Sequence, residues 1–206
     1  MKRIIACALL LPAVATAQDA NEISYDYFDF SYNRTDWDAG STEIDGTGWG
    51  GRLSVGIREN VFVSAEYRDW NADGASGGST FKKLGFGVHG EVSDNWSIFG
   101  EVGFKSQDID LGAGNIEDDP GYLAGGARWA VADGYELRFV ADFYEKGKGT
   151  PAGVGESSIT FGGDIYVTDA VALMFEVNEN DDNTTSFLMG MRIYHKKDSS
   201  NLRRSR

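Results

Sequence analysis

The chain has 206 residues, a formal net charge of −13 and a single cysteine, Cys7. Nucleic-acid-binding proteins present basic patches, so this acidic composition excludes nucleic acid as a partner. One cysteine cannot form a disulfide bond within the chain. Beyond residue 17, no apolar run approaches the roughly 20 residues of a transmembrane helix.

Residues 1–17 have the three parts of a secretory signal peptide. Lys2 and Arg3 form the basic start, residues 4–14 form a short apolar core, and Ala15-Thr16-Ala17 provides a cleavage site. We therefore expect a Sec-exported chain that begins after Ala17. Because cleavage removes Cys7, the mature chain would contain no thiol.

Ten segments follow in which apolar and polar residues alternate with the period of two that is typical of β-strands. In chain order they cover residues 22–33, 46–58, 61–68, 83–92, 96–106, 121–131, 135–144, 157–167, 171–177 and 185–195. The stretch 83–106 shows the pattern most clearly, as a hairpin with a turn at residues 93–95. We expect residues 107–120 to form the longest loop.

The connections between these segments alternate between long and short. Transmembrane β-barrels show this asymmetry, with short periplasmic turns and longer extracellular loops. Segments of about ten residues also suit a tilted crossing of the bilayer. The sequence therefore predicts an all-β fold: a transmembrane, antiparallel, up-and-down β-barrel of ten strands, with eight strands as the alternative. Residues 18–195 would form this barrel, and residues 196–206 a basic periplasmic tail.

Alternation alone does not say which face points outward, because a soluble lipocalin-like barrel alternates too. The apolar faces of the ten segments carry no charge, as a lipid-facing surface requires. Aromatic residues also gather near the segment ends, as in the interfacial girdles of membrane barrels. We place Trp96, Trp129 and Tyr135 at the short-turn end, and Phe28, Tyr32, Trp49, Tyr67, Phe104 and Phe143 at the long-loop end.

The polar faces are balanced in charge, although the chain as a whole is strongly acidic. Unpaired buried charge is costly, so a balanced set is expected where charges pack inside a narrow lumen. The predicted lumen charge network contains eight acids, eight bases and one histidine: Asp29, Glu66, Glu91, Glu101, Glu136, Asp142, Asp164, Glu176, Arg52, Arg58, Arg68, Lys83, Lys105, Arg128, Arg138, Arg192 and His89. Glycines on the same faces would make room for these side chains, and the long connections carry most of the negative charge.

Three segments are similar to parts of the small Gram-negative outer-membrane β-barrels of the OmpA/OmpX type. SYDYFDFSY and GTGWGGRLSVGI resemble the first two strands of that group, and SFLMGMRIYH resembles its C-terminal assembly signal. The resemblance implies a location in the cell outer membrane and insertion by the barrel-assembly machinery. It also implies contact with outer-membrane lipid and lipopolysaccharide.

The residues do not indicate catalysis. His89 is the only histidine within a segment body, and its neighbours at two-residue spacing are Gly87 and Glu91. The acidic clusters in 108–119 and 178–183 lack the spacing of a calcium loop. We therefore expect no enzymatic activity, no catalytic residue, no cofactor and no metal. The predicted function is that of a monomeric barrel with a structural or surface-interaction role. The alternatives are a small passive, porin-like pore and a soluble periplasmic lipocalin-like binder of hydrophobic ligands.

Overall fold

The computed structural model describes residues 23–38, 43–73, 77–110, 115–118, 120–145, 157–181 and 183–195. The predicted signal peptide, residues 1–17, and the predicted basic tail, residues 196–206, lie outside the described residues.

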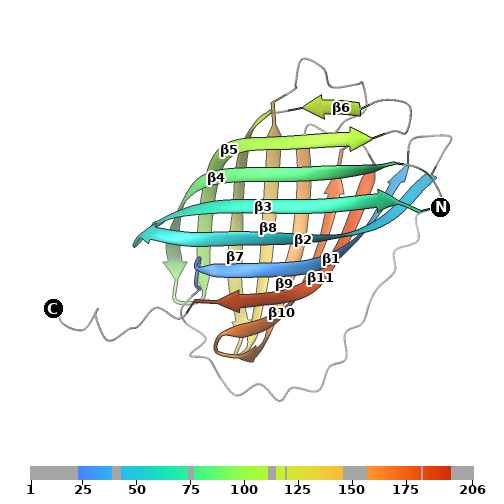
Figure 1. Ribbon diagram of the computed structural model, residues 1–206. Coiled ribbons are helices and arrows are strands. Elements are labelled where there is room, and N and C mark those ends of the chain that lie inside the picture. The colour runs from blue at the N-terminus through green and yellow to red at the C-terminus, as the bar shows by residue number, and fades with distance from the viewer. Residues whose placement is uncertain are drawn as a thin grey trace.

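Ten long strands form a closed antiparallel barrel (Figure 1). The ten long strands are β1 (Tyr27–Asp38), β2 (Glu43–Arg58), β3 (Val61–Ala72), β4 (Gly78–Ser93), β5 (Trp96–Asp110), β7 (Gly121–Ala132), β8 (Tyr135–Tyr144), β9 (Ser157–Thr168), β10 (Val171–Asn180) and β11 (Thr184–Tyr194), and the short strand β6 is Asn115–Asp118. Each long strand pairs with the next along the chain, and β1 pairs with β11 to close the barrel. The predicted ten-stranded barrel is confirmed, and β6 is a short addition that pairs only with β5.

The strands extend further toward the long connections than the alternation predicts. β1 continues to Asp38, β3 to Ala72 and β5 to Asp110, where the sequence analysis placed loops. The prediction that 107–120 is a loop is wrong for Gln107–Asp110 and for β6. At this height both faces of the sheet carry polar residues, so the apolar rows that mark a strand are absent while backbone pairing persists.

The barrel has two distinct ends. The turn end carries the tight turns at residues 59–60, 94–95, 133–134 and 169–170, where Gly134 adopts a φ of 79°. The loop end carries the longer connections. Because Tyr27 pairs with Tyr194, both ends of the described chain, residues 23 and 195, lie at the turn end.

The apolar rows point outward and the polar rows point inward. Leu84, Phe104 and Met189 are 63%, 73% and 72% exposed, whereas the buried residues of the described chain are mostly polar or charged. This is the reverse of a soluble lipocalin-like barrel, which would keep its apolar rows inside. No helix that could cross a membrane is found among the described residues.

The aromatic residues expected at the turn end lie there, and Tyr32, Trp49 and Tyr67, expected at the loop end, lie midway along β1, β2 and β3. Trp96 and Trp129 stack across β5 and β7 at the turn end, with ring centres 5.0 Å apart. Phe28 was placed at the loop end, but it pairs with Ile193 and therefore lies at the turn end. β1 begins at Tyr27, five residues later than the predicted segment, so Phe28 is the second residue of the strand and lies close to the turn end.

Inward-facing glycines bring strands and side chains close together. At Gly85 and Gly87 the space of a missing Cβ is taken by Tyr122 and Phe62, respectively. At Gly103 a Cβ would instead lie 2.0 Å from the backbone oxygen of Leu84. These glycines therefore serve both the packing of the lumen and the close approach of neighbouring strands.

Candidate functional site: the charged lumen

Arg192 occupies the centre of the lumen and is fully buried. Its Nε and Nη2 donate to the two carboxylate oxygens of Asp29 at 2.6 and 2.8 Å, and its Nη1 donates to Asp164 at 2.6 Å. The Tyr194 hydroxyl donates to the same Asp164 oxygen at 2.8 Å. Paired hydrogen bonds between a guanidinium and a carboxylate fix both groups in orientation. Arg192 therefore ties β11 to β1 and to β9 through the interior.

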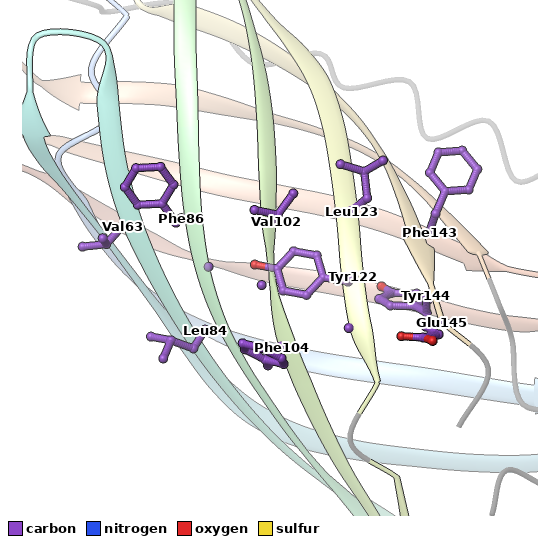
Figure 2. A pocket seen from close by; sticks show the side chains of 13 residues that line it. Val63, Leu84, Phe86, Val102, Phe104, Tyr122, Leu123, Phe143, Tyr144 and Glu145 are labelled. Carbon is purple, nitrogen blue, oxygen red and sulfur yellow. The ribbon is translucent and has the colours of Figure 1, made fainter. Parts of the chain in front are cut away.

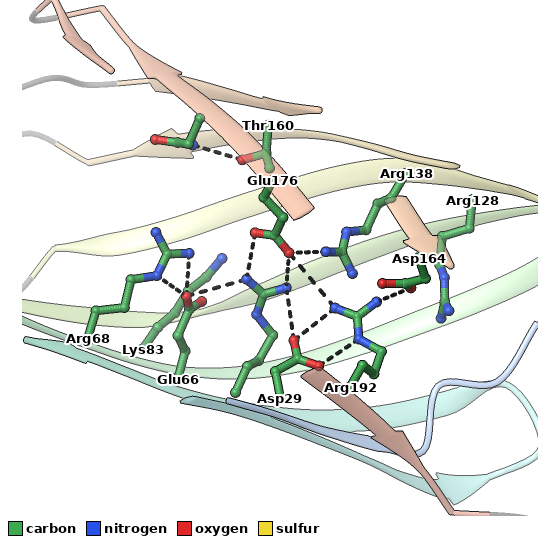
Figure 3. A network of polar contacts seen from close by, with 12 residues as sticks. Asp29, Glu66, Arg68, Lys83, Arg128, Arg138, Thr160, Asp164, Glu176 and Arg192 are labelled. Carbon is green, nitrogen blue, oxygen red and sulfur yellow. Dashed lines mark hydrogen bonds and ion pairs between the residues drawn. The ribbon is translucent and has the colours of Figure 1, made fainter. Parts of the chain in front are cut away.

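Glu176 connects this centre to the walls formed by β2 and β8. Its carboxylate accepts hydrogen bonds from Arg52 at 3.1 Å and from Arg138. Arg52 also lies 3.4 Å from Glu66, and Glu66 accepts a hydrogen bond from Arg68. Figure 3 shows this chain of alternating carboxylate and guanidinium groups crossing the lumen. Glu66 pairs with two cations and Glu176 with three, so loss of one member would leave a partner charge buried with fewer opposite charges.

A second cluster lies on β4, β5, β7 and β8. Lys83 Nζ lies 2.7 Å from Asp142 and 3.9 Å from Glu101. Glu101 accepts hydrogen bonds from the Tyr122 hydroxyl and from Ser64, the latter at 2.9 Å. Lys83 Nζ also sits 4.1 Å from the centre of the Tyr122 ring, where a cation is attracted to the ring face. This cluster fills the side of the lumen opposite Arg192.

A third cluster closes the turn end. Arg128 donates to both oxygens of Glu136 at 2.6 and 2.9 Å and to the Tyr194 hydroxyl at 3.3 Å. The Tyr166 hydroxyl donates to Glu136 at 3.2 Å. Arg128 is 2% exposed, so this ion pair is shielded from bulk water. Because Tyr194 also contacts Asp164, this cluster is continuous with the central one.

The structure places fourteen of the predicted lumen charges inside the barrel, buried or half-buried, as seven acids and seven bases: Asp29, Glu66, Glu101, Glu136, Asp142, Asp164, Glu176, Arg52, Arg68, Lys83, Lys105, Arg128, Arg138 and Arg192. Lys105 lies with its Nζ 4.0 Å from the centre of the Tyr144 ring. Arg58 and Glu91 differ from the expectation, because both are exposed at the turn end. Each lies beside a register shift, where the strands leave the regular ladder.

The tyrosines that complete these clusters were missed by sequence reasoning. Four tyrosine hydroxyls form hydrogen bonds with lumen side chains: those of Tyr25, Tyr122, Tyr166 and Tyr194. All four occupy inward positions of their strands or continue such a row. In the sequence they are recognisable as tyrosines on the polar faces, but the predicted lumen set contained only charged residues and histidine.

Both histidines of the chain, His89 and His195, lie at the turn end. His89 stacks on the Tyr25 ring, with centres 3.9 Å apart and planes at 11°, so its ring forms part of an aromatic cluster. Within the described ranges, no group of three or more histidine or carboxylate side chains is placed to hold a metal ion.

A groove of about 850 Å³ lies on the outer surface of β4, β5, β7 and β8 (Figure 2). Its walls are outward-facing apolar side chains, among them Leu84, Phe86, Phe104, Leu123 and Phe143, which are 48–73% exposed. The groove therefore belongs to the apolar exterior of the barrel. Its lining also includes inward-facing residues of the same strands, Gly85, Gly103, Tyr122 and Tyr144.

No protein-family model matches the chain, and no curated protein matches it. Among solved structures the chain is similar to the NanC porin (12% identity, TM-score 0.49, covering 82% of this chain and 100% of that one). It is also similar to the translocator domain of the autotransporter NalP from Neisseria meningitidis (11%, 0.48, 86% and 90%). A third similarity is to the KdgM porin in complex with disordered oligogalacturonate (8%, 0.45, 82% and 99%).

The resemblance to small outer-membrane β-barrels holds at the level of the fold. The chain closes into an antiparallel barrel with short turns at one end, longer connections at the other, and an apolar outer surface. These features come from the chain's own structure and do not depend on the similarities.

Proposed function

We propose that the protein is a non-enzymatic β-barrel of the Gram-negative outer membrane. In this proposal its lumen is closed by its own ion network, and its loop end meets molecules outside the cell. The observation that carries the proposal is the continuous set of ion pairs from Arg68 through Arg52 and Glu176 to Arg192 and Asp164. The Lys83 cluster fills the lumen along β4, β5, β7 and β8, and the Arg128 cluster fills it at the turn end.

Membrane placement is supported by the outer surface. Rows of exposed leucine, phenylalanine, valine and isoleucine surround the described barrel, from Phe28 on β1 to Ile193 on β11. A soluble monomer rarely exposes apolar patches beyond a few hundred Å², and larger patches mark contact with a membrane or a partner. A closed barrel also satisfies its backbone hydrogen bonds internally, as the bilayer core requires.

Closure of the lumen is supported by burial. Arg192, Glu176, Asp29 and Asp164 are each at most 2% exposed, although they carry charge. Barrels of about eight strands have interiors that side chains just fill, and two further strands add limited space. Ions crossing this lumen would have to displace side chains that are already paired. We therefore infer a structural or surface-interaction role, and passive conduction is the competing function.

The test is electrical recording of the purified, refolded protein in planar bilayers, after cell fractionation has located it. We expect outer-membrane localisation, a gel mobility shift on boiling and no steady conductance. Large, reproducible single-channel steps would contradict the closed lumen and favour the passive pore. In that case, charge reversal at Arg52 or Glu101 should change ion selectivity. A soluble periplasmic protein without a mobility shift would contradict membrane placement.

Lipopolysaccharide is the proposed neighbour at the loop end. Arg34 and Lys82 are outward-facing cations on β1 and β4, with side chains 56% and 55% exposed. Both lie beyond the apolar rows of their strands, at the height where a lipid headgroup would begin. Their ion pairs with Asp36, Asp45 and Asp108 are exposed, so they can exchange for phosphate contacts at small cost. We further propose a monomer inserted by the barrel-assembly machinery.

A further inference from the structure

Residues 23–26 precede β1 and lie at the turn end of the lumen. The carbonyl oxygen of Ser24 accepts a hydrogen bond from Arg128 at 2.5 Å, and that of Tyr25 accepts one from Ser54 at 2.6 Å. Arg128 lies on β7, which stands five strands from β1 in either direction around the ten-stranded barrel. The segment is therefore held by a side chain that extends from the opposite wall.

Tyr25 occupies a pocket formed by side chains from four strands. Its ring lies 3.9 Å from His89, 5.1 Å from Phe62 and 6.0 Å from Phe99, measured between centres. The Arg128 guanidinium carbon lies 4.8 Å from the ring centre, and the Tyr25 hydroxyl lies 3.0 Å from Ser97 Oγ. Tyr25 is only 6% exposed, although it lies outside the barrel strands. An aromatic ring is thus seated in the mouth of the barrel.

The contacts that hold this segment differ from those of the central network. Tyr25 is held by ring stacking and by hydrogen bonds between neutral groups, apart from the approach of Arg128. Hydrogen bonds between neutral groups are weaker than charge-assisted ones. Displacing Tyr25 would leave no carboxylate uncompensated, because its ring carries no charge. Release of the Tyr25 side chain therefore breaks ring contacts and one neutral hydrogen bond, whereas Ser24 and Asp26 hold the segment's backbone through Arg128 and Gly56.

We propose that residues 23–26 form a removable stopper, with Tyr25 as its head, that controls access to the lumen from the turn end. The stopper blocks the passage between the outside of the mouth and Ser97. The inference rests on the proposed function only in assigning closure from the loop end to the ion network. The barrel thus has two seals in series, and the stopper is the one that can move.

The test uses a single thiol at the position behind the stopper. Ser97→Cys is introduced with Cys7→Ser, and the barrel is reconstituted in one orientation and treated with a small, membrane-impermeant ammonium methanethiosulfonate. Applied at the turn end, the reagent should modify this thiol at least about tenfold more slowly than an Asn95→Cys thiol in the exposed turn, because reaction requires opening. Adding Tyr25→Ala should abolish most of that protection.

Three further variants separate the stopper from general loosening of the barrel. Tyr25→Phe retains the ring and should retain the protection, as should Tyr32→Ala, which removes an outward-facing aromatic from β1, the strand that follows the stopper. Phe62→Ala removes one wall of the pocket while leaving the hydrogen bonds of the segment in place, and should give partial exposure. The boiling-dependent gel shift confirms that each variant is folded. If Tyr25→Ala alone fails to fold, Phe62→Ala provides the decisive comparison.

The side of reagent addition distinguishes the two seals. If the thiol at 97 reacts as fast as the exposed reference in the parent, or stays protected in Tyr25→Ala and Phe62→Ala, the stopper is overturned. If Tyr25→Ala exposes the thiol only to reagent at the turn end, both the stopper and the closed network stand. Reaction from the loop end as well would overturn the closed network while leaving the stopper in place.

Discussion

At the scale of single residues, Arg192 shows why the lumen depends on complete pairing. Its guanidinium has no exposed surface and is held by carboxylates on β1 and β9. A buried ion pair contributes little net stability when whole, because desolvation offsets the attraction. Removing one partner is different, because the remaining charge stays in a low-dielectric interior. The consequence of a substitution therefore depends on what it leaves behind.

We predict that Arg192→Met destabilises the folded barrel by about 3–5 kcal/mol, since it removes the cation paired with Asp164 and leaves Asp29 with only Arg52, at 3.7 Å. The measurement is equilibrium unfolding by urea of the lipid-reconstituted protein. The double variant Arg192→Met, Asp29→Asn should recover part of this loss, because it removes one of the stranded charges. Arg34→Met is the matched control on an exposed pair and should cost less than about 1 kcal/mol. Equal costs at the two positions would refute the argument.

The sequence identifies which charges face inward but not which ones meet. Alternation assigns Asp29, Asp164 and Arg192 to polar faces, and the structure places all three inside. Their mutual contact depends on the relative height of β1, β9 and β11, which alternation does not contain. Arg58 and Glu91 show the same limit, because the register shifts beside them are a property of strand pairing. Tyr25 shows a second limit of the sequence pattern, because its side chain is buried in the lumen although the residue precedes the first strand.

At the scale of strands, close pairing depends on glycines at inward positions. A Cβ on Gly103 of β5 would lie 2.0 Å from the Leu84 backbone oxygen and 2.7 Å from the Tyr122 ring. Gly125 of β7 faces outward, and its nearest neighbour for a Cβ would be the Phe99 oxygen at 3.8 Å. The two glycines lie on neighbouring strands, so they offer a matched comparison.

We predict that Gly103→Ala lowers the free energy of unfolding by about 1–3 kcal/mol, because the methyl group has no space. Gly125→Ala should change it by less than about 0.5 kcal/mol, because the position is open. Urea titration followed by tryptophan fluorescence measures both. A neutral effect of Gly103→Ala would mean that β4 and β5 are further apart than the structure shows.

Strand identity was predictable where lipid and lumen impose opposite polarities on the two faces. The bounds of β8 coincide with the predicted segment, and those of β9 differ by one residue at its end. β1, β3 and β5 exceed their predicted ends toward the loop end. There the outward residues include Arg34, and the alternation that reports on lipid is lost. The hydropathy pattern thus predicts the span of the apolar surface rather than the full length of the strands.

At the scale of the whole molecule, the excess negative charge and the charge-balanced lumen lie in different regions of the barrel. The formal charge of the chain is −13, yet the packed lumen contains seven acids and seven bases. Most of the excess lies at the loop end, in the strand extensions beyond the apolar rows and in the connections between them. Pairing is required only where water is excluded, so the exposed rim can remain acidic while the interior is balanced. The outer surface then carries charge only beyond its apolar rows.

This division gives a test of the boundary between lipid and water on a single strand. Val102 and Ser106 both face outward on β5, and Val102 lies within the apolar rows at 52% exposure. We predict that Val102→Arg costs about 2–4 kcal/mol of stability in bilayers, as for arginine near the midplane, whereas Ser106→Arg costs about 0–1 kcal/mol. Urea unfolding in liposomes measures both. In a water-exposed barrel the two substitutions would have similar, small effects. That result would place the apolar rows outside the bilayer, and a larger cost at Ser106 would shift the boundary toward the loop end.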